Sequence, residues 1–363
     1  MPPCESAVAD LAPASWALND DQQGLRAAAR AFARERLEPL LGRRADLAQW
    51  RETVRLAATL DLATMILPEH MGGMEISRHD LALVVEQFAV GPLERAAELT
   101  LSIPALMTLR EFNALDRLPD QEIQHYFDGT TSIALGIPDI DASGLSILRQ
   151  HPASPAMTVR IDDQRARLIF TTLPAGTLDN QGSSVPVTGL GALSIERYAA
   201  VTAGDASVLV VSGNSNQLVQ DPVPQWLTNT AMYLAALLSG AVQQGVEFAL
   251  AYSVARQTFR KPIAAHQLVA ARLADMLVSA HTMHLFLRSV TAQDTQMQID
   301  AVSMMARHIA TEAMDVTREL VQLCGGHGYV EGLPPAARFQ TVHWFAMLLM
   351  KVEAALRAFT ASA

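Results

Sequence analysis

The residue pattern of this chain of 363 residues changes twice, and the changes limit the folds that it can adopt. Residues 19–123 and 225–358 carry apolar side chains at helical spacing, whereas residues 132–218 contain short β-prone runs separated by Pro, Gly, Asn and Asp. Helices, then strands, then helices do not alternate as the elements of a βαβ fold do. We therefore expect a mainly α protein with a central β-domain. The expected domains are residues 1–131, 132–224 and 225–363.

The first helix has readable start and stop signals. Asn19 can cap the helix, and Gln22 stands three residues later, where it can complete a capping box. Pro39 lacks a backbone N–H and should end or bend the helix. Further along, the loop that contains Gly72 and Gly73 can adopt positive φ angles, so we expect a tight turn there.

Composition excludes several classes of protein. Half of the residues are apolar, 18% are charged and the formal net charge is −10, which disfavours nucleic acid as a partner. The longest apolar stretches, such as Ala231–Gly240, are shorter than the roughly 18–20 residues that a bilayer span requires, and Met1–Ser15 does not resemble a signal peptide. Two cysteines make no disulfide framework. We expect a cytoplasmic protein that binds neither membrane nor nucleic acid.

The most specific motifs lie in the last third of the chain. Tyr-Ser-Val-Ala-Arg-Gln-Thr-Phe-Arg-Lys-Pro-Ile occupies residues 252–263, His-Gln follows at 266–267, and Gln-Leu-Cys-Gly-Gly-His-Gly-Tyr occupies residues 322–329. Two weaker segments precede them, the helix start at residues 18–33 and Pro-Glu-His-Met-Gly-Gly at residues 68–73. In this order and spacing, the segments resemble the acyl-CoA dehydrogenase family, whose members oxidise the Cα–Cβ bond of acyl-CoA thioesters.

The resemblance implies a fold, a cofactor and partners. It implies an N-terminal helical domain, a middle β-barrel or β-sandwich domain and a C-terminal four-helix bundle. It also implies FAD as cofactor, an acyl-CoA as substrate and electron-transfer flavoprotein as electron acceptor. In the family, the two C-terminal motifs form a cradle for the flavin of the neighbouring subunit. The cradle positions here are Arg256, Phe259, Gln267, Gln322, Gly325 and Gly326.

These residue types suit a nucleotide cofactor. A guanidinium matches a pyrophosphate group, and glycines allow the backbone to approach a ligand closely. The competing interpretation is that Arg256 is an ordinary exposed charge and that Gly325 and Gly326 only end a helix. The joint order and spacing of the motifs favour the cradle.

The catalytic carboxylate of the family has no counterpart. Counted from the Gly-Gly pair, the usual position falls on Leu349, and the position used by a minority of members falls on Thr230. Neither side chain can remove a proton from carbon. No Asp or Glu lies between Gly332 and Lys351. Glu353 is the nearest carboxylate, and we expect it on the solvated face of the last helix. The sequence therefore predicts no catalytic residue on this chain.

The family segment that lies against flavin and substrate, Thr-Glu-Pro-x-Ala-Gly-Ser-Asp, is also degenerate. This chain has Gly-Ile-Pro-Asp-Ile-Asp-Ala-Ser-Gly at residues 136–144, and the β-domain after it is shortened. The interpretation predicts an eroded β-domain beside a retained cradle.

Other signals carry less weight. His281 and His284 are three residues apart on a predicted helix and could share a metal, but without a nearby carboxylate or Cys we interpret them as helix-surface histidines. Cys324 and His327 flank the Gly-Gly pair and could pair as nucleophile and base; buried or packing roles fit them better. We expect no metal site.

Two functions from different classes remain open. The first is one subunit of a heteromeric, FAD-dependent acyl-CoA dehydrogenase of the steroid side-chain type, an α2β2-type heterotetramer. In it, a second acyl-CoA dehydrogenase-like subunit carries the catalytic Glu and this chain completes the flavin pocket. The second is a non-catalytic binding or scaffold relative. A homomeric enzyme with an unusual base, or with base-free elimination chemistry, stands between the two.

Overall fold

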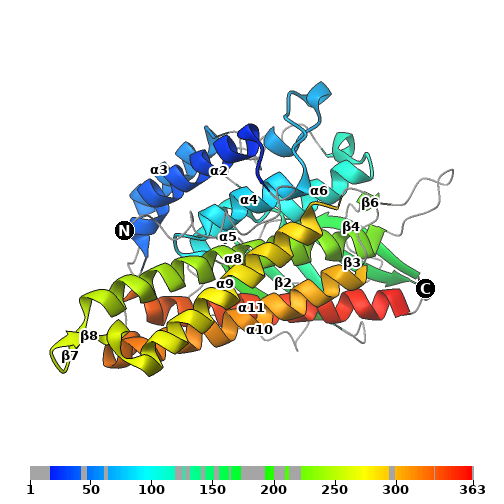
Figure 1. Ribbon diagram of the computed structural model, residues 1–363. Helices are drawn as coiled ribbons and strands as arrows, with labels where there is room; N and C mark the ends of the chain where they lie inside the picture. Colours follow the sequence, from blue (N-terminus) through cyan, green and yellow to red (C-terminus); the bar gives the residue numbers. More distant parts are fainter. Residues whose placement is uncertain are drawn as a thin grey trace.

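The computed structural model describes 13 segments of the chain, and the statements below concern these residues. They are residues 17–41, 47–60, 64–118, 126, 131–139, 144–150, 155–162, 165–172, 193–199, 209–211, 222–293, 299–330 and 332–361. Helices at the two ends of the chain pack together, and a sheet formed by the middle of the chain lies on one side of them (Figure 1). The predicted fold class, mainly α with a central sheet domain, is confirmed.

Two of the described N-terminal helices, α2 and α4, begin at capping boxes. Asn19 and Gln22 form the predicted capping box at the start of α2, and Ser77 forms a second one with Asp80 at the start of α4. At Pro39 the helix has already changed to a π-helical turn and a 3₁₀ turn, as expected for a residue without an N–H. The α-helices here are α2 (Asp20–Phe32), α3 (Leu47–Ala58), α4 (Arg78–Phe88), α5 (Leu93–Thr100) and α6 (Ile103–Glu111).

Short helical turns connect these helices, and one of them depends on glycine. Gly72 has φ +80°, and a Cβ at Gly73 would lie 2.1 Å from the carbonyl oxygen of Leu67. The predicted tight turn is therefore confirmed. The short turns are η2 (Ala33–Leu37), η3 (Glu38–Leu40), η4 (Thr64–Ile66), η5 (Glu69–Met71) and η6 (Leu115–Arg117).

The middle of the chain forms one six-stranded sheet with the order β5-β2-β1-β3-β4-β6. Neighbouring strands are antiparallel except for β1 and β3, which pair in parallel with Leu135 opposite Met157. All five residues of β1 are buried, so this central strand is covered on both faces. The strands are β1 (Ala134–Pro138), β2 (Gly144–Arg149), β3 (Pro155–Asp162), β4 (Arg165–Thr172), β5 (Ser194–Ala199) and β6 (Leu209–Val211).

Four long helices form the C-terminal bundle, and α8 is its central member. They are α8 (Pro222–Ala255), α9 (Gln267–Thr291), α10 (Ile299–Cys324) and α11 (Pro334–Ala361). α8 packs against the other three and against α4 and α6. By length and hydropathy α8 could cross a bilayer. The uninterrupted apolar runs of the sequence, such as Ala231–Gly240, are too short to have indicated this. However, 72% of the apolar window is buried within the fold, as for a core helix.

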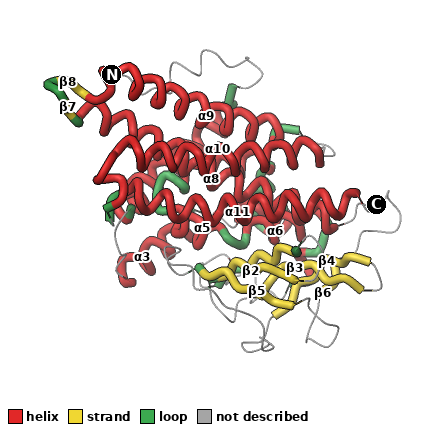
Figure 2. The backbone as a smooth tube through the Cα atoms, turned by 90° about the horizontal axis from the view of Figure 1, so that it is seen from below, coloured by secondary structure: helices red, strands yellow, loops and turns green. Residues whose placement is uncertain are grey.

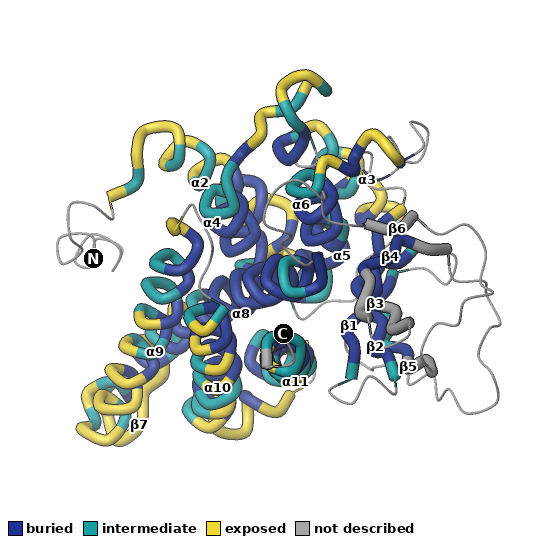
Figure 3. The backbone as a smooth tube through the Cα atoms, turned by 90° about the vertical axis from the view of Figure 1, so that its right-hand side faces the viewer, coloured by how far each residue is buried: buried dark blue, intermediate teal, exposed yellow. Residues whose placement is uncertain are grey.

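The bundle contacts the sheet along one side and ends in an exposed hairpin. The contact with the sheet is made by α11, which packs on β1 (Figure 2). At the far end, a small hairpin of β7 (Gln257–Thr258) and β8 (Lys261–Pro262) extends away from the body and is largely exposed (Figure 3). The turns η7 (Ile263–Ala265) and η8 (Gly325–Tyr329) come together at this end, where Ile263 and Gly325 line one hollow. The motifs of the sequence analysis therefore gather at an exposed end.

Candidate functional site

An open hollow of about 390 Å³ lies where the end of α8 meets the end of α10. It brings together two stretches of chain that are about seventy residues apart, which is the arrangement that the two motifs predict. Three predicted cradle residues, Arg256, Gly325 and Gly326, line it. The other lining residues are Tyr252, Thr258, Ile263, Leu323, Cys324 and His327.

The β7–β8 hairpin holds Arg256 at the edge of this hollow. The backbone N–H of Ile263 donates to the carbonyl oxygen of Arg256 over 2.8 Å, which closes the hairpin directly after α8. Phe259 and Arg260 form the tip with φ values of +51° and +64°, unusual for residues other than glycine. The side chain of Phe259 is 91% exposed, and its ring touches His266 edge-on.

The Gly-Gly turn is open on its outer side. Gly325 has φ +57°, so its conformation favours glycine. A Cβ at Gly326 would meet nothing within 4 Å, so packing within this chain does not require glycine there. Gly328 differs, because a Cβ there would lie 2.2 Å from the carbonyl oxygen of Val321. Gly328 serves the fold of the turn, whereas Gly326 leaves room for a ligand.

The remaining predicted residues surround the hollow without lining it. Gln267 is exposed at the first position of α9, and Gln322 is exposed on the last turn of α10. The side-chain amide of Gln322 donates to the hydroxyl of Tyr329 over 2.7 Å. The structure thus places three of the six residues in the hollow and the other three on the exposed surface beside it.

A hydrogen-bonded chain that sequence reasoning missed forms the floor of the hollow. The hydroxyl of Tyr252 lies 3.0 Å from Nδ1 of His327 and 3.3 Å from the carbonyl oxygen of Cys324. A proton on Nδ1 satisfies all three groups, because the imidazole then donates to Tyr252 and Tyr252 donates to the carbonyl. The packing role predicted for His327 is therefore wrong: its ring is exposed in the hollow. Tyr252 and His327 both lie inside the C-terminal motifs, and this position in the motifs is the sequence signal that could have identified them.

The prediction that Cys324 is a buried packing residue is confirmed. Its side chain is buried, and burial raises the pKa of the thiol to about 11. A thiol with this pKa is protonated at neutral pH and is a poor nucleophile. Cys324 therefore contributes packing and a backbone carbonyl rather than covalent chemistry.

The hollow fits a phosphate-bearing group. Arg256 provides a guanidinium, and Gly326 leaves backbone accessible. Both are exposed, so a ligand here would be only partly covered by this chain. Complete enclosure would require a second chain over the same surface.

The two positions expected for a catalytic base are buried and inert. Leu349 lies in the middle of the uninterrupted helix α11 and is 0% exposed. Thr230 is also fully buried, and its hydroxyl donates to the carbonyl oxygen of Trp226, one turn earlier in α8. Both side chains are inaccessible in the described structure, and neither can act as a base toward carbon.

Contacts within the chain join the bundle to the sheet. The ammonium group of Lys351 on α11 donates to Asp139 Oδ1 and to Ser146 Oγ, each over 2.6 Å. The indole N–H of Trp226 on α8 donates to the carbonyl oxygen of Gly136 over 3.2 Å. Asp139 and Gly136 belong to the degenerate segment whose family counterpart lies against flavin and substrate. These polar groups are therefore engaged by the bundle itself.

The expectation for Glu353 is wrong. Its side chain is 1% exposed, and Oε1 accepts hydrogen bonds from Ser303, Arg307 and Arg357, each over 2.8 Å. These donors hold the pKa of Glu353 below its usual value, against the opposing effect of burial. Glu353 is a structural anion that ties α11 to α10.

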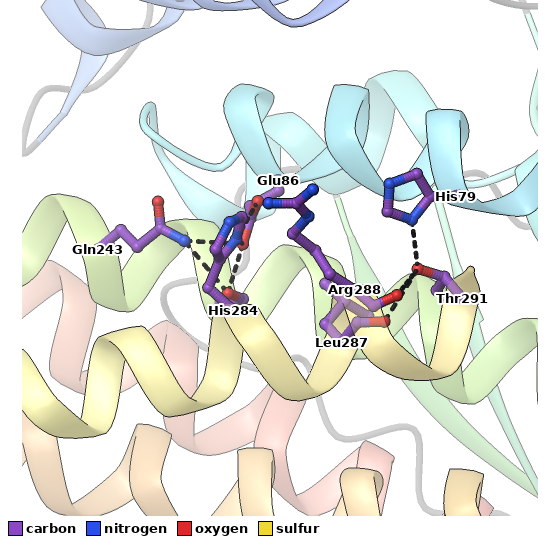
Figure 4. A network of polar contacts seen from close by, with 8 residues as sticks. His79, Glu86, Gln243, His284, Leu287, Arg288 and Thr291 are labelled. Carbon is purple, nitrogen blue, oxygen red and sulfur yellow. Dashed lines mark hydrogen bonds and ion pairs between the residues drawn. The ribbon is translucent and has the colours of Figure 1, made fainter. Parts of the chain in front are cut away.

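The interpretation of His284 as a surface residue is also wrong. Its Nδ1 lies 2.9 Å from both carboxylate oxygens of Glu86, a residue of α4 that is 1% exposed (Figure 4). Ser239 and Gln243 of α8 also donate to Glu86, over 2.5 and 2.7 Å. This network joins α4, α8 and α9. Sequence spacing along one helix could not reveal it, because the partners come from three helices.

Comparison with known proteins agrees with this fold at both ends of the chain. The family model described as the N-terminal domain of acyl-CoA dehydrogenase matches residues 19–111, and the one described as its C-terminal domain matches residues 223–352. An acyl-CoA dehydrogenase of Bacillus subtilis is 30% identical over 103 residues, which is 28% of this chain and 27% of that protein. The aligned part thus spans about a quarter of this curated relative.

Solved structures extend the likeness to almost the whole chain. Butyryl-CoA dehydrogenase of Megasphaera elsdenii aligns with a TM-score of 0.75 and 18% identity, covering 95% of this chain and 98% of that one. A glutaryl-CoA dehydrogenase of Mycobacterium smegmatis in complex with FADH2 aligns with a TM-score of 0.66 and 16% identity, covering 92% and 94%. With both terminal domains matched and the fold shared throughout, this chain belongs to the acyl-CoA dehydrogenase family.

Proposed function

We propose that this chain is one subunit of a heteromeric, FAD-dependent acyl-CoA dehydrogenase. In this proposal a second, related subunit carries the catalytic carboxylate and holds the flavin ring. This chain covers the phosphates of that flavin with Arg256 and the Gly325–Gly326 turn. The observation that carries the proposal is the contrast between this exposed hollow and the buried Leu349 at the position of the base.

The exposed end of the bundle supports the need for a partner. The hollow opens to solvent, and the exposed apolar side chains of Phe259, Leu268 and Tyr329 belong to the segments beside it. Large apolar side chains exposed together are typical of protein interfaces, which are enriched in aromatic residues. A subunit that bound its cofactor alone would have less reason to leave these side chains uncovered.

The junction supports the division of labour. Lys351, Trp226 and their partners join the bundle to the sheet with hydrogen bonds made within the chain. These polar groups are already engaged, whereas Arg256 of the hollow is exposed and can meet a phosphate. We therefore place the bound flavin at the interface with the partner and none of its ring in this chain.

Several residues of the hollow have a chemical task in this proposal. FAD supplies the hydride acceptor for the β-hydrogen of the acyl group. Arg256 neutralises phosphate charge, and Gly326 allows a backbone approach that any side chain would hinder. Tyr252 holds the ring of His327 at the floor through Nδ1. The α-proton is removed by the partner's carboxylate, because this chain offers none. Electron-transfer flavoprotein is the acceptor that we propose, in the cytoplasm.

Co-purification tests the proposal. The chain is expressed alone and together with an acyl-CoA dehydrogenase-like protein encoded beside it that retains the family's Glu. We expect the chain alone to retain little FAD and the co-expressed pair to purify as a yellow heterotetramer that dehydrogenates an acyl-CoA. A stable homomer of this chain with stoichiometric FAD would contradict the proposal.

The acyl group needs a separate screen. The resemblance does not identify the acyl group, so the complex is assayed with steroid side-chain CoA esters and with short and medium straight-chain acyl-CoAs. A complex that forms and binds FAD but oxidises none of these would instead favour the non-catalytic scaffold.

A further inference from the structure

A second hollow lies on the surface of α10, beside the last turns of α11. Its volume is about 570 Å³, within the range of sites that bind small molecules. Glu312, which lines this hollow, and Leu323, which lines the hollow of Arg256, are about 16 Å apart along α10, so the two hollows are separate. The residues that line this α10–α11 hollow are Asp300, Ser303, Met304, Arg307, His308, Thr311, Glu312 and Arg357.

Two arginine side chains of the α10–α11 hollow are held by one buried carboxylate. Nη2 of Arg307 and Nε of Arg357 each donate to Oε1 of Glu353 over 2.8 Å. The hydroxyl of Ser303 donates to the same oxygen, also over 2.8 Å. Because they share this acceptor, the two arginine nitrogen atoms are at most about twice that distance apart. Glu353 therefore holds two guanidinium groups close to each other at the hollow.

The charges at this point do not balance. The donors hold the pKa of Glu353 below its usual value, so one negative charge stands against two positive charges. The side chains of Arg307 and Arg357 are each more than half exposed. In the described part of the chain, Arg307 bonds an acceptor only through Nη2, and Arg357 only through Nε. The remaining N–H groups of both guanidinium groups are free to meet a second anion.

Asp300 and Glu312 also line the α10–α11 hollow but do not supply this second anion. Neither forms an ion pair with Arg307 or Arg357 among the described residues. Asp300 stands in the first turn of α10, where the helix dipole favours an acidic side chain, about 10 Å along the axis from Arg307. Glu312 is about 7 Å from Arg307 along the same axis. Their charges repel an anion from both ends of the hollow and so confine it to the two arginines.

We propose that the α10–α11 hollow binds a small molecule through a carboxylate or phosphate group that Arg307 and Arg357 share. The planar fork of a guanidinium matches both kinds of anion. Met304, one turn before Arg307, lines the same hollow with an exposed apolar side chain, which can contact the body of the ligand. A cationic group would face the uncompensated positive charge. The site does not depend on the proposed function.

Three aromatic probes of similar size test the proposal on the full chain, without an activity assay. Benzoate and phenyl phosphate carry the two kinds of anion, and benzamide is the neutral analogue of benzoate. Binding is followed by NMR through the methyl signal of Met304. We expect at least one of the anions to bind about tenfold or more tightly than benzamide, the effect of one hydrogen bond between charged groups. The anion that binds more tightly identifies the preferred group.

Substitutions show whether the arginines make this contact. Arg357→Met should weaken binding of the anion about tenfold, while Glu353 keeps its bonds from Arg307 and Ser303. Arg357→Lys keeps the charge and serves if the first variant does not fold; it should also weaken binding, because an ammonium group lacks the planar fork. Arg318→Met is the matched control, because it removes a similarly exposed arginine of α10 that does not line the hollow. It should leave binding unchanged.

Two results on the wild-type chain would overturn the proposal: equal binding of benzamide and the anions, and binding of none of the probes. An equal loss of anion binding in Arg318→Met would also overturn it, because net charge rather than the α10–α11 hollow would then attract the anion. Co-purification with the partner and FAD retention are separate measurements. The dehydrogenase proposal and this one can therefore fail independently.

Discussion

The hollow at the end of the bundle and the junction between bundle and sheet differ in how their polar groups are used. At the hollow, Arg256 and His327 are exposed, and the backbone at Gly326 is open. At the junction, Lys351 is engaged by Asp139 and Ser146, and the carbonyl of Gly136 accepts from Trp226. Among the described residues, the polar groups at the hollow are exposed, whereas those at the junction have partners within the chain.

The comparison shows how burial constrains polar groups. A buried polar group needs a partner within the protein, because an unpaired buried group costs about 1–3 kcal/mol. At the junction the partners are side chains of α8 and α11. At the exposed hollow water can solvate the same kinds of group, so no partner within the chain is needed. Substitutions that affect folding and ligand binding differently therefore test this difference between the junction and the hollow.

The largest expected effect concerns Leu349. The change Leu349→Ala removes a fully buried side chain from α11 and should lower the free energy of unfolding by about 2–5 kcal/mol. Leu349→Glu should destabilise the chain at least as much, because it buries a charge without a partner, and it should not restore proton abstraction. Urea unfolding and turnover by the complex measure the two effects. Met347→Ala, on the same helix but 56% exposed, is the control and should change stability by less than about 0.5 kcal/mol.

An active Leu349→Glu chain, stable without its partner, would mean that the junction still accepts substrate. That result would remove the contrast between the two regions.

The second prediction concerns pH and the anchoring of α11. Arg338, near the start of α11, is buried and donates to the carbonyl oxygens of Ala89 and Val90. Near it, burial raises the pKa of Glu94 to about 7 from 4.5. A carboxyl whose pKa is higher in the folded state binds a proton that the unfolded state has released. Stability should therefore fall between about pH 4.5 and pH 7, by at most about 3 kcal/mol from this group.

Urea unfolding at pH 5 and pH 8, for the wild type and Glu94→Gln, measures this contribution. The variant should show a smaller loss of stability between the two pH values. An unchanged loss would show that Glu94 does not titrate in this range.

The fold could be predicted because its signals are local. Asn19 and Gln22 act three residues apart, and the Gly-Gly turn follows directly after the last residue of α10, so sequence order alone locates them. The hollow was predicted in part for the same reason, since Arg256, Gly325 and Gly326 stand in short motifs. The proposed cofactor roles of these residues stay predictions until a ligand is measured.

The errors concern residues whose partners are distant in sequence. Glu353 was expected in solvent, yet it accepts from Ser303 and Arg307, 50 and 46 residues away. His284 was expected on a surface, yet it pairs with Glu86, 198 residues away. Charged residues are usually exposed, so composition favoured solvent in both cases. Only the packing of three or more helices supplies the missing partners.

The third prediction concerns cofactor retention at the hollow. Arg256→Met removes an exposed charge, so stability should change by less than about 0.5 kcal/mol, whereas FAD retention by the complex should weaken by about 1.5–3 kcal/mol. Excess FAD should restore turnover. Fluorescence titration of released FAD measures the affinity. Arg318→Met is the matched control, because it removes an exposed arginine that pairs only with surface carboxylates.

An unchanged FAD affinity in Arg256→Met would contradict the role of the hollow, and the same loss in Arg318→Met would show that net charge alone is responsible.

The smallest expected effect on folding comes from a glycine that packing does not require. A Cβ at Gly326 would meet nothing within 4 Å, so Gly326→Ala should leave the unfolding free energy within about 0.5 kcal/mol of the wild type. The added methyl would nevertheless occupy space that we assign to the partner's flavin, and overpacking of this kind costs about 1–3 kcal/mol of affinity. Gly328→Ala should behave in the opposite way, because its Cβ would lie 2.2 Å from the carbonyl oxygen of Val321 and disturb the turn itself. Measuring Tm and FAD retention for both variants therefore separates a glycine kept for a ligand from one kept for the fold. If Gly326→Ala binds FAD as tightly as the wild type, the backbone of this turn does not approach the cofactor, and Arg256 alone defines the contact.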